Sequence, residues 1–433
     1  MPTSRHIKST RHQRQINDVE YVSSVQAMSI LGVRRETLYT YVSRGLIKAM
    51  RPTGTKAKLY RKTDVEKLKS RAVARSGGPQ VSHTLRYGEP IAQTWISEIT
   101  AHGPRYRGAL ARDLVRDGRS FEFASELIWT GVSRSRDIAW PAPPESKRLE
   151  PLVKMALQAA KPISPLKLLS ILATSQSAFE RADGDVQAAD LSACRRLLQT
   201  LAGVSGVFGP KKRFSPPREG EFISQCVARG LGLEDRVEVV RAVDAALVLS
   251  AEHELSAPTF AARICASTGA DLYACVAAAM LTQSGAMQVG GAVEVEALID
   301  SFPEHLEPDD ALALAAASGF KSNELPCFTH PLYADEDPRS AELLDIAGRL
   351  NVHGPDTPKI LAFVEGAQKA GQHPNVFAAL VILCKVIGLP NGIGAMLHTL
   401  ARTTGWIAHT MEQRLTGAML RPRAKYMGTS TSR

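Results

Sequence analysis

The sequence predicts a mainly α-helical protein in which a small basic module precedes a long helical region. From Leu85 onward, apolar residues recur three and four positions apart, and alternating runs of β-branched residues are few, which is typical of packed helices. The 433 residues are too many for one compact core and suffice for two or three domains. Residues 76–84 are small and polar and contain Gly77, Gly78 and Pro79, which indicates a linker.

Positive charge is concentrated at the beginning of the chain. Residues 1–75 contain 17 Lys and Arg against 5 Asp and Glu, a net charge of +12, whereas the whole chain carries +10. Such a local excess indicates a module that binds a polyanion. Residues 1–20 lack hydrophobic periodicity and are predicted to be a flexible basic arm, which either contacts nucleic acid or is a solvated tail.

The cysteines and the apolar residues indicate in which compartment of the cell the protein is expected. Six cysteines are scattered without any CxxC pair or zinc-ligand spacing, so we expect free thiols in a reducing compartment and no metal site. The N-terminus lacks the apolar core of a signal peptide, and nowhere do about 18 apolar residues run uninterrupted. We therefore expect a cytoplasmic protein that does not bind membranes.

Residues 21–75 are expected to begin with two short helices. Ser23 or Ser24 can cap the first helix, and Gly32 makes the turn to the second. The residues expected to face inward are Val25, Met28, Leu31, Leu38, Tyr41 and Val42. This leaves basic and hydrogen-bonding residues on the outer side of the second helix, where they could enter a DNA groove.

The same region resembles a known group of DNA-binding domains. TLYTYVSRGLI from Thr37 is similar to the recognition helix of MerR and excisionase winged helix-turn-helix domains, and MRPTGTKAKLYRKTDVEKLKSR from Met50 is similar to their wing and closing helix. The resemblance implies DNA binding, with affinity from phosphate contacts. The candidate DNA-binding residues are Arg34, Arg35, Thr37, Thr40, Arg44, Lys56, Lys58 and Arg61. A small helical protein-interaction module is the alternative, which the charge of +12 disfavours.

Five segments of residues 85–433 resemble segments of one known family. HELSAPTFAARICASTGADLYACVAAAM from His253 is similar to HELNASTFTARVVASTGADLYAAVAAA of the citrate synthase family, and four more segments agree in order. They are RYRGALARDLVRDGRSFEFASELIWTG from Arg105, FTHPLYADEDPRSAEL from Phe328, LARTTGWIAHTMEQR from Leu400 and LRPRAKYMG from Leu420. The resemblance implies all-helical large and small domains, the small one at about 291–389, in a homodimer. It also implies a coenzyme A thioester as substrate and no other cofactor.

The resemblance assigns the residues that hold the dicarboxylate oxaloacetate. His253 matches a substrate-binding histidine, and His330 matches the catalytic histidine that polarises the ketone. Arg339 and Arg402 match carboxylate-binding arginines, and Arg421 matches one supplied across the dimer interface. Arginine suits this role because its planar guanidinium pairs with both oxygens of a carboxylate.

Other positions depart from the family pattern. Where the family has a histidine in GPLHGGANE, this chain reads GAMQVGGAVE, with Gln288 or Val289 at that position. Phe377 in HPNVF replaces the aspartate that removes a methyl proton, and phenylalanine cannot accept one. A missing general base slows a reaction by roughly 10²–10⁴-fold. In PCFTH, Cys327 and Thr329 replace two glycines of the coenzyme A loop, so we expect coenzyme A to be crowded.

These observations leave three hypotheses open. The first is a DNA-binding regulator whose degenerate synthase domain responds to a carboxylate such as oxaloacetate or citrate, with weak or lost condensation. The second is an active citrate or 2-methylcitrate synthase with a DNA-binding appendage. The third is a domain that serves only for dimerisation.

Overall fold

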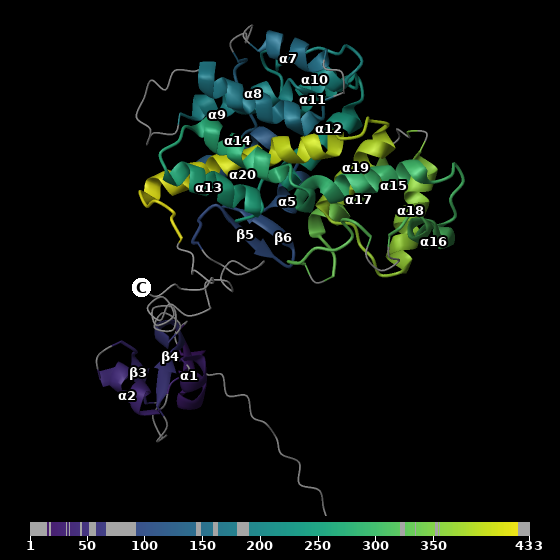
Figure 1. Cartoon of the computed structure of the whole chain (residues 1–433). Coiled ribbons are helices and arrows are strands. Elements are labelled where there is room, and N and C mark those ends of the chain that lie inside the picture. The colour runs from purple at the N-terminus through teal and green to yellow at the C-terminus, as the bar shows by residue number, and fades with distance from the viewer. Residues whose placement is uncertain are drawn as a thin grey trace, which may run out of the picture. The chain divides into compact units, whose positions relative to one another are not determined.

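The structure is a computed structural model of the chain. It describes residues 15–16, 19–31, 33, 35–43, 46–51, 58–65, 92–143, 149–158, 163–179, 190–320, 325–333, 335–350, 354 and 356–422. The chain divides into two compact units, residues 1–91 and 92–433, which are drawn in Figure 1.

The first unit combines short helices with a small antiparallel sheet. Its strands pair in the order β1-β2-β4-β3. The elements are β1 (Gln15–Ile16), β2 (Val19–Ser23), α1 (Ser24–Leu31), α2 (Arg35–Ser43), β3 (Ala49–Met50) and β4 (Leu59–Arg61). Two helices are thus followed by an antiparallel pair of strands, and residues 62–65 begin a further helix.

A small core holds this unit together. Val22, Ala27, Leu38, Ile47, Tyr60 and Val65 are its buried residues. Ser23 caps α1, because its hydroxyl accepts the backbone N–H of Gln26 at 3.3 Å, as expected for a serine before a helix. The expectation that Val25 faces inward is wrong: it is 69% exposed, and Ala27 takes the buried position.

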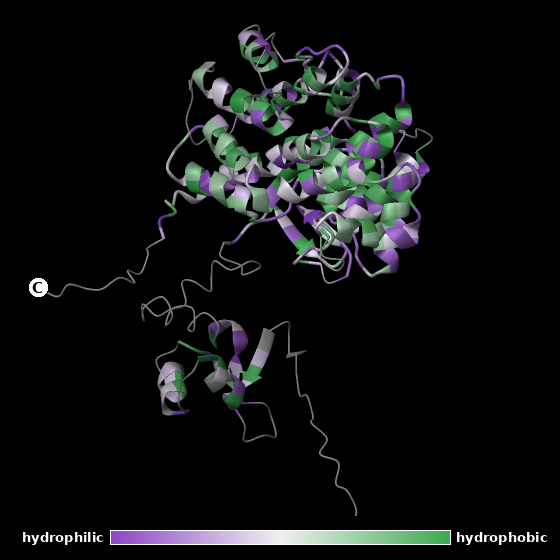
Figure 2. Cartoon of the chain, turned by 45° about the vertical axis from the view of Figure 1, so that its right-hand side comes forward, coloured by the Kyte–Doolittle hydropathy of each residue, from purple (hydrophilic) through white to green (hydrophobic). Residues whose placement is uncertain are grey.

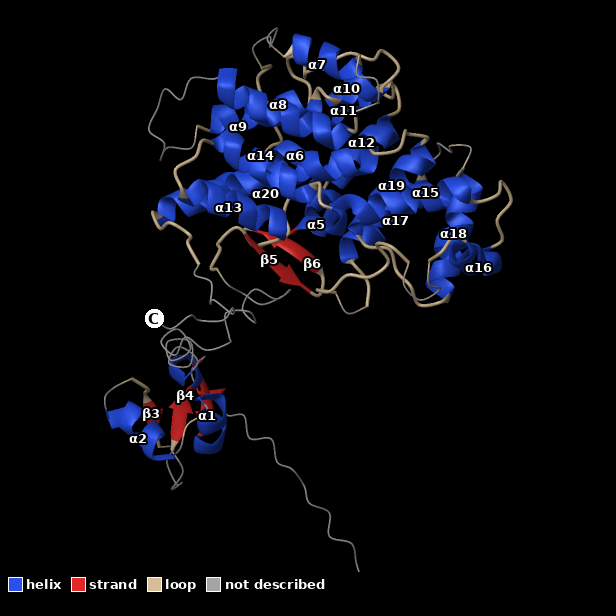
Figure 3. Ribbon diagram, in the orientation of Figure 1, coloured by secondary structure: helices blue, strands red, loops and turns tan. Residues whose placement is uncertain are grey.

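The second unit is helical except for one small sheet. β5 (Ser97–Thr100), β6 (Gly103–Tyr106) and β7 (Ala109–Leu110) pair antiparallel, and Figure 3 shows β5 and β6 in red among the helices. The expectation of all-helical domains is therefore wrong in this segment. The strands are stabilised by their turns, since Gly103 and Gly108 have positive φ angles that glycine adopts without strain.

Helices make up the rest of this unit. Up to residue 250 they are α5 (Ala111–Arg116), α6 (Phe121–Thr130), α7 (Glu150–Leu157), α8 (Pro165–Phe179), α9 (Leu191–Ala202), α10 (Ser205–Phe208), α11 (Ile223–Leu231) and α12 (Val237–Ser250). After residue 250 they are α13 (Ala257–Ser267), α14 (Leu272–Gln283), η1 (Ala286–Gly290), α15 (Gly291–Ser301), η2 (Pro308–Asp310), α16 (Ala311–Ala317), α17 (Pro338–Arg349), α18 (Thr357–Lys369), α19 (Val376–Ile387) and α20 (Ile393–Thr416).

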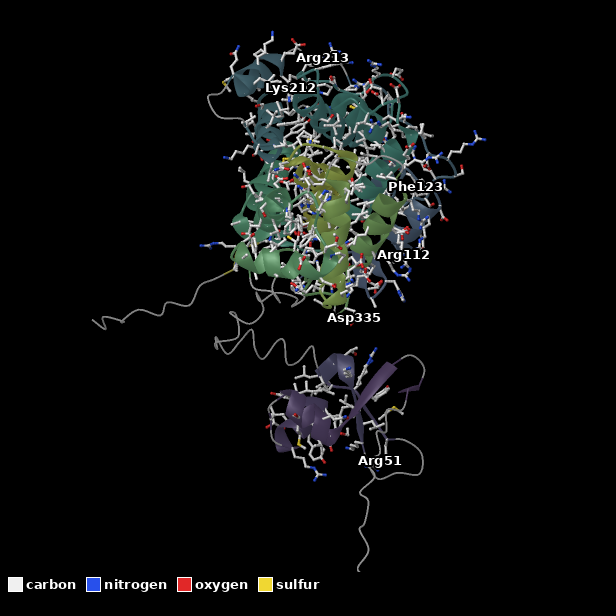
Figure 4. The ribbon with its side chains drawn as sticks, turned by 90° about the vertical axis from the view of Figure 1, so that its right-hand side faces the viewer. Arg51, Arg112, Phe123, Lys212, Arg213 and Asp335 are labelled. Atoms are coloured by element: carbon white, nitrogen blue, oxygen red, sulfur yellow. The ribbon has the colours of Figure 1, made fainter. Side chains whose placement is uncertain are left out.

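Helix α20 lies at the centre of the unit. It packs against α6, α8, α9, α12, α13, α14 and α19. Its 24 residues are buried along most of their length, including Trp406. Figure 2 shows hydrophobic residues gathered in the interior helices, and Lys212 and Arg213 reach the surface in Figure 4. Among the described residues, no helix is long and apolar enough to cross a membrane.

Candidate functional site

Two histidines expected to bind substrate lie together between α12 and α17. His253 follows the end of α12, and His330 lies in the loop before α17, with 5.2 Å between the ring centroids. Tyr333 completes the cluster, since its hydroxyl is 3.0 Å from Nε2 of His253. Asp335, in the same loop as His330, lies at the surface (Figure 4), so this loop reaches solvent.

The small sheet fixes the turn that carries His253. The hydroxyl of Ser97 in β5 donates to Glu252 at 3.0 Å, and the backbone N–H of Ile99 donates to Glu254 at 3.0 Å. Glu254 has a φ of 52°, a conformation that L-residues rarely adopt. Strained backbone of this kind is held by its surroundings and concentrates at functional sites.

Arg339 enters the pocket from the first turn of α17. Its guanidinium is buried and donates to both oxygens of Asp337, at 2.9 and 2.8 Å. Burial alone would raise the pKa of Asp337, but Arg339 lowers it below the ordinary value. Asp337 also accepts the backbone N–H of Val376 at 3.1 Å. One carboxylate therefore orients the arginine and joins α17 to α19.

Helix α20 supplies Arg402, which is also buried. It donates to Glu252 at 2.8 Å and to the hydroxyl of Thr259 at 2.7 Å. His409 lies 3.1 Å from the other oxygen of Glu252. Burial would raise the pKa of Glu252, but the charges of Arg402 and His409 lower it to about 2. Glu252 is therefore ionised at neutral pH and holds Arg402 in place.

Gly405 allows α20 to approach this carboxylate. Its backbone N–H donates to the carbonyl of Ala251 at 3.2 Å. A Cβ atom at position 405 would overlap the Glu252 side chain. Only glycine therefore fits there without displacing Glu252.

The histidines of the pocket are neutral at physiological pH. Burial, and then the positive charge of Arg339, lower the pKa of His330 to about 4 and the pKa of His253 well below its ordinary value. A neutral imidazole can donate one hydrogen bond and accept another. Two arginines, each paired with a carboxylate, and two neutral histidines thus gather here, and these are groups that can bind a small acid containing a ketone or hydroxyl.

Phe377 lies next to this cluster. It stands in the first turn of α19, where the side chain of Asn375 accepts its backbone N–H at 2.9 Å. The amide of Asn375 also donates to the carbonyl of Thr329 at 3.0 Å, next to His330. The Phe377 ring packs against the imidazole of His398, with 4.3 Å between centroids.

Sequence reasoning missed four residues of the pocket: Tyr333, Glu252, Asp337 and His398. His398 could have been found, because it precedes Arg402 by four residues and so lies on the same face of α20. Glu252 could not have been found by spacing, since the fold brings Arg402 and His409 to it, whereas Asp337 lies only two residues before its partner Arg339.

The structure also describes the remaining residues that were assigned from the resemblance, at positions 288, 289, 327 and 421. Residues 286–290 form a π-helical turn, which accommodates an inserted residue. Val289 is buried there and Gln288 half-buried, so of the two candidates Gln288 keeps a more accessible side chain. Cys327 has a φ of 60°, in the left-handed region that favours glycine, which is the residue the resemblance predicts there. Arg421 is exposed beyond the end of α20.

The structure describes part of the predicted DNA-binding set. Tyr39 of α2 is 41% exposed and lies near two cations: Arg35 and Lys58 are each 5.6 Å from its ring centroid. Arg35 also donates to the Tyr39 hydroxyl at 2.9 Å. Thr40 is exposed, whereas Thr37 and Arg61 are half-buried. Arg34, Arg44 and Lys56 lie outside the described residues.

The chain resembles known proteins in its second unit. A family model described as "Citrate synthase, C-terminal domain" matches residues 86–423. Citrate synthase 2 of Bacillus subtilis is 30% identical over 243 residues, 54% of this chain and 64% of that protein. The 2-methylcitrate synthase of Shewanella oneidensis is 31% identical over 196 residues, 44% of this chain and 51% of that protein. The chain thus spans between half and two thirds of these relatives.

A solved structure has the same fold. Citrate synthase from Thermoplasma acidophilum, in a ternary complex with carboxymethyl coenzyme A and oxaloacetate, superimposes with a TM-score of 0.67 at 22% identity. The match covers 81% of this chain and 97% of that one. Citrate synthases use the coenzyme A thioester as a substrate and need no metal or other cofactor, in agreement with the expectation above.

Proposed function

The chain belongs to the citrate synthase family, and on that premise we propose that it is a DNA-binding regulator whose second unit binds a small di- or tricarboxylate. Condensation of that ligand with an acyl-coenzyme A is slow or lost. Oxaloacetate and citrate are the first ligands to test, because they match the charges of the pocket.

One observation carries the proposal. His253, His330, Arg339 and Arg402 converge from separate elements, while Phe377 stands where the family resemblance leads us to expect the base. A pocket that kept its anion-binding groups and lost its base retains binding more readily than catalysis. Cys327 and Thr329 further disfavour the second substrate, coenzyme A.

The first unit supports the DNA-binding part of the proposal. Two helices with a following strand pair agree with a winged helix-turn-helix arrangement, and Arg35 and Lys58 place two cations on its surface. Such cations bind phosphates without reading sequence. The net charge of +12 over residues 1–75 also favours DNA binding.

We expect a homodimer in which Arg421 of each chain reaches the pocket of the other. Its exposed position agrees with such a role. Closure of the segment at about 291–389 over the ligand would then change the spacing of the two DNA-binding units, because a dimer recognises half-sites at a fixed separation.

The test combines ligand binding with DNA binding. Oxaloacetate and citrate are titrated into the full chain by calorimetry, and the same acids are added to a complex with a duplex selected from random sequences. We expect binding of at least one acid and a change in DNA affinity. An Arg402→Gln variant should lose both effects, whereas Arg241→Gln, on the exposed side of α12, should keep them. Carboxylate binding without any effect on DNA would contradict the coupling.

An active citrate or 2-methylcitrate synthase is the second candidate, and His398 favours it. An imidazole can accept a proton, and this one lies against Phe377. Consumption of acetyl- or propionyl-coenzyme A with oxaloacetate at rates of ordinary enzymes, about 1–10³ s⁻¹, would favour this candidate over the regulator. Failure to bind any carboxylate would favour a dimerisation domain.

A further inference from the structure

His398 joins the pocket from a direction that the assigned residues do not cover. It lies on α20 one turn before Arg402 and is 5% exposed. The ring of Phe377 from α19 covers one side of the imidazole. The amide of Gln283, from the end of α14, lies 3.4 Å from Nδ1. The imidazole is thus held by three helices at the edge of the anion-binding cluster.

Within the part of the chain that the structure describes, the hydrogen bond of His398 is made at Nδ1, and the other ring nitrogen, Nε2, makes none. Gln283 can fix either tautomer, because its amide can present the oxygen or the NH₂ group to Nδ1. With the oxygen toward Nδ1–H, the lone pair of Nε2 is available to accept a proton.

The charged groups around His398 keep it neutral. Arg402 faces it from α20, Arg339 from α17, and His253 is the titratable group on the turn after α12. From α19 and α14 the contacts are Phe377 and Gln283, which do not titrate. Burial and the two arginines therefore hold the pKa of His398 well below its ordinary value. A dicarboxylate bound to the arginines would offset their charge and make the imidazole more basic.

We propose that His398 is the proton acceptor of this pocket for a carbon acid, namely the acyl group of a thioester placed beside a bound keto diacid. The C–H bond next to the thioester carbonyl breaks, its electron pair forms the enolate, and the proton moves to Nε2. The enolate carbon bonds to the ketone carbon, and the imidazolium returns its proton to the resulting alkoxide through solvent. His398 therefore carries whatever condensation the chain performs.

This inference rests on the proposed function, because it requires the keto diacid in the pocket. The experiment measures deuterium uptake from D₂O into acetyl-coenzyme A, with and without oxaloacetate, together with condensation. We expect slow, oxaloacetate-dependent condensation or exchange that declines in acid, where the imidazole becomes protonated and can no longer accept a proton. His398→Phe keeps a ring against Phe377 but cannot accept a proton. It should lower the rate by about 10²–10⁴-fold, as for loss of a general base.

Two further variants separate chemistry from folding. His102→Ala removes an exposed histidine and should leave the rate unchanged. Phe377→Asp combined with His398→Phe introduces a carboxylate beside the lost imidazole and should recover part of the activity. Undiminished activity in His398→Phe, or no exchange and no condensation in the native chain, would overturn the assignment.

Oxaloacetate binding, measured by calorimetry on the same proteins, separates the two proposals. If the native chain binds no oxaloacetate, the carboxylate pocket itself fails. If it binds the acid and His398→Phe also binds it but exchanges as fast as the native chain, only the role of His398 fails. Binding by both proteins with exchange lost in the variant supports the inference.

Discussion

Glu252 is the carboxylate on which one side of the pocket depends. It accepts the Ser97 hydroxyl and pairs with Arg402 and His409, and the members of this ion-pair group are buried. A buried ion pair contributes little net stability as a pair, but removing one partner leaves an uncompensated charge.

We therefore expect Glu252→Gln to destabilise the second unit by about 3–5 kcal/mol, because Arg402 would stay buried without its counterion. Urea unfolding monitored by circular dichroism measures this. Glu98→Gln, on the exposed side of β5, should change stability by less than about 0.5 kcal/mol. Equal effects of both variants would show that the Glu252 pair is unimportant.

The lowered pKa of His330 implies that the free energy of unfolding depends on pH. Its pKa is about 4 in the folded chain and near 6.5 when unfolded, because burial and Arg339 disfavour the imidazolium. Between these values the unfolded chain binds a proton that the folded chain does not. Stability should therefore fall as pH falls from 6.5 to 4, without further loss from this group below pH 4. Urea unfolding at several pH values tests this. His330→Gln should reduce the slope, and His102→Gln should not.

At the scale of elements, the start of α19 connects helix stability with the pocket. Asn375 caps α19 and holds the carbonyl of Thr329 beside His330. We expect Asn375→Ala to lower stability by about 1 kcal/mol and also to weaken carboxylate binding. Asp190→Ala removes a comparable cap from α9. It should cost similar stability while leaving the dissociation constant unchanged, and calorimetry compares the two.

Helix α2 and strand β4 allow a test of DNA binding. Lys58 lies exposed beside Tyr39, where it could contact a phosphate. Lys58→Ala should weaken binding to mixed-sequence duplex and lower the slope of log affinity against log salt by about 0.9. Lys154→Ala, on the exposed side of α7, removes the same charge and should leave the slope unchanged. Fluorescence anisotropy at several salt concentrations measures both.

The lengths of the helices and strands explain which of them could be predicted from the sequence. Long helices such as α20 repeat their apolar spacing over many residues, so they were predictable. The strands β5, β6 and β7 have two to four residues, too few for a period-two pattern to stand out. His253 and Arg402 were assigned through motifs. Asp337 lies two residues before Arg339 and was within reach of the same reasoning, whereas Tyr333 became recognisable only when the fold brought it to His253.

For the whole molecule, Arg421 gives a test of assembly. If each pocket uses Arg402 of one chain and Arg421 of the other, Arg402→Gln and Arg421→Gln homodimers should both bind carboxylate poorly. After unfolding and refolding the two variants together, half of the dimers are mixed, and each mixed dimer has one intact pocket. About a quarter of all sites should then bind normally. No recovery on mixing would mean that Arg421 does not act across the interface.

Gly405 limits how the site could change to accept acids of a different size. Because the backbone of α20 already touches the turn at Ala251, this wall cannot move closer, and a side chain at 405 would push Glu252 away from Arg402. Changes in ligand length must therefore be accommodated by α17, which carries Arg339, and by α19, which carries Phe377. Variants selected for larger acids should accumulate substitutions there, with position 405 unchanged.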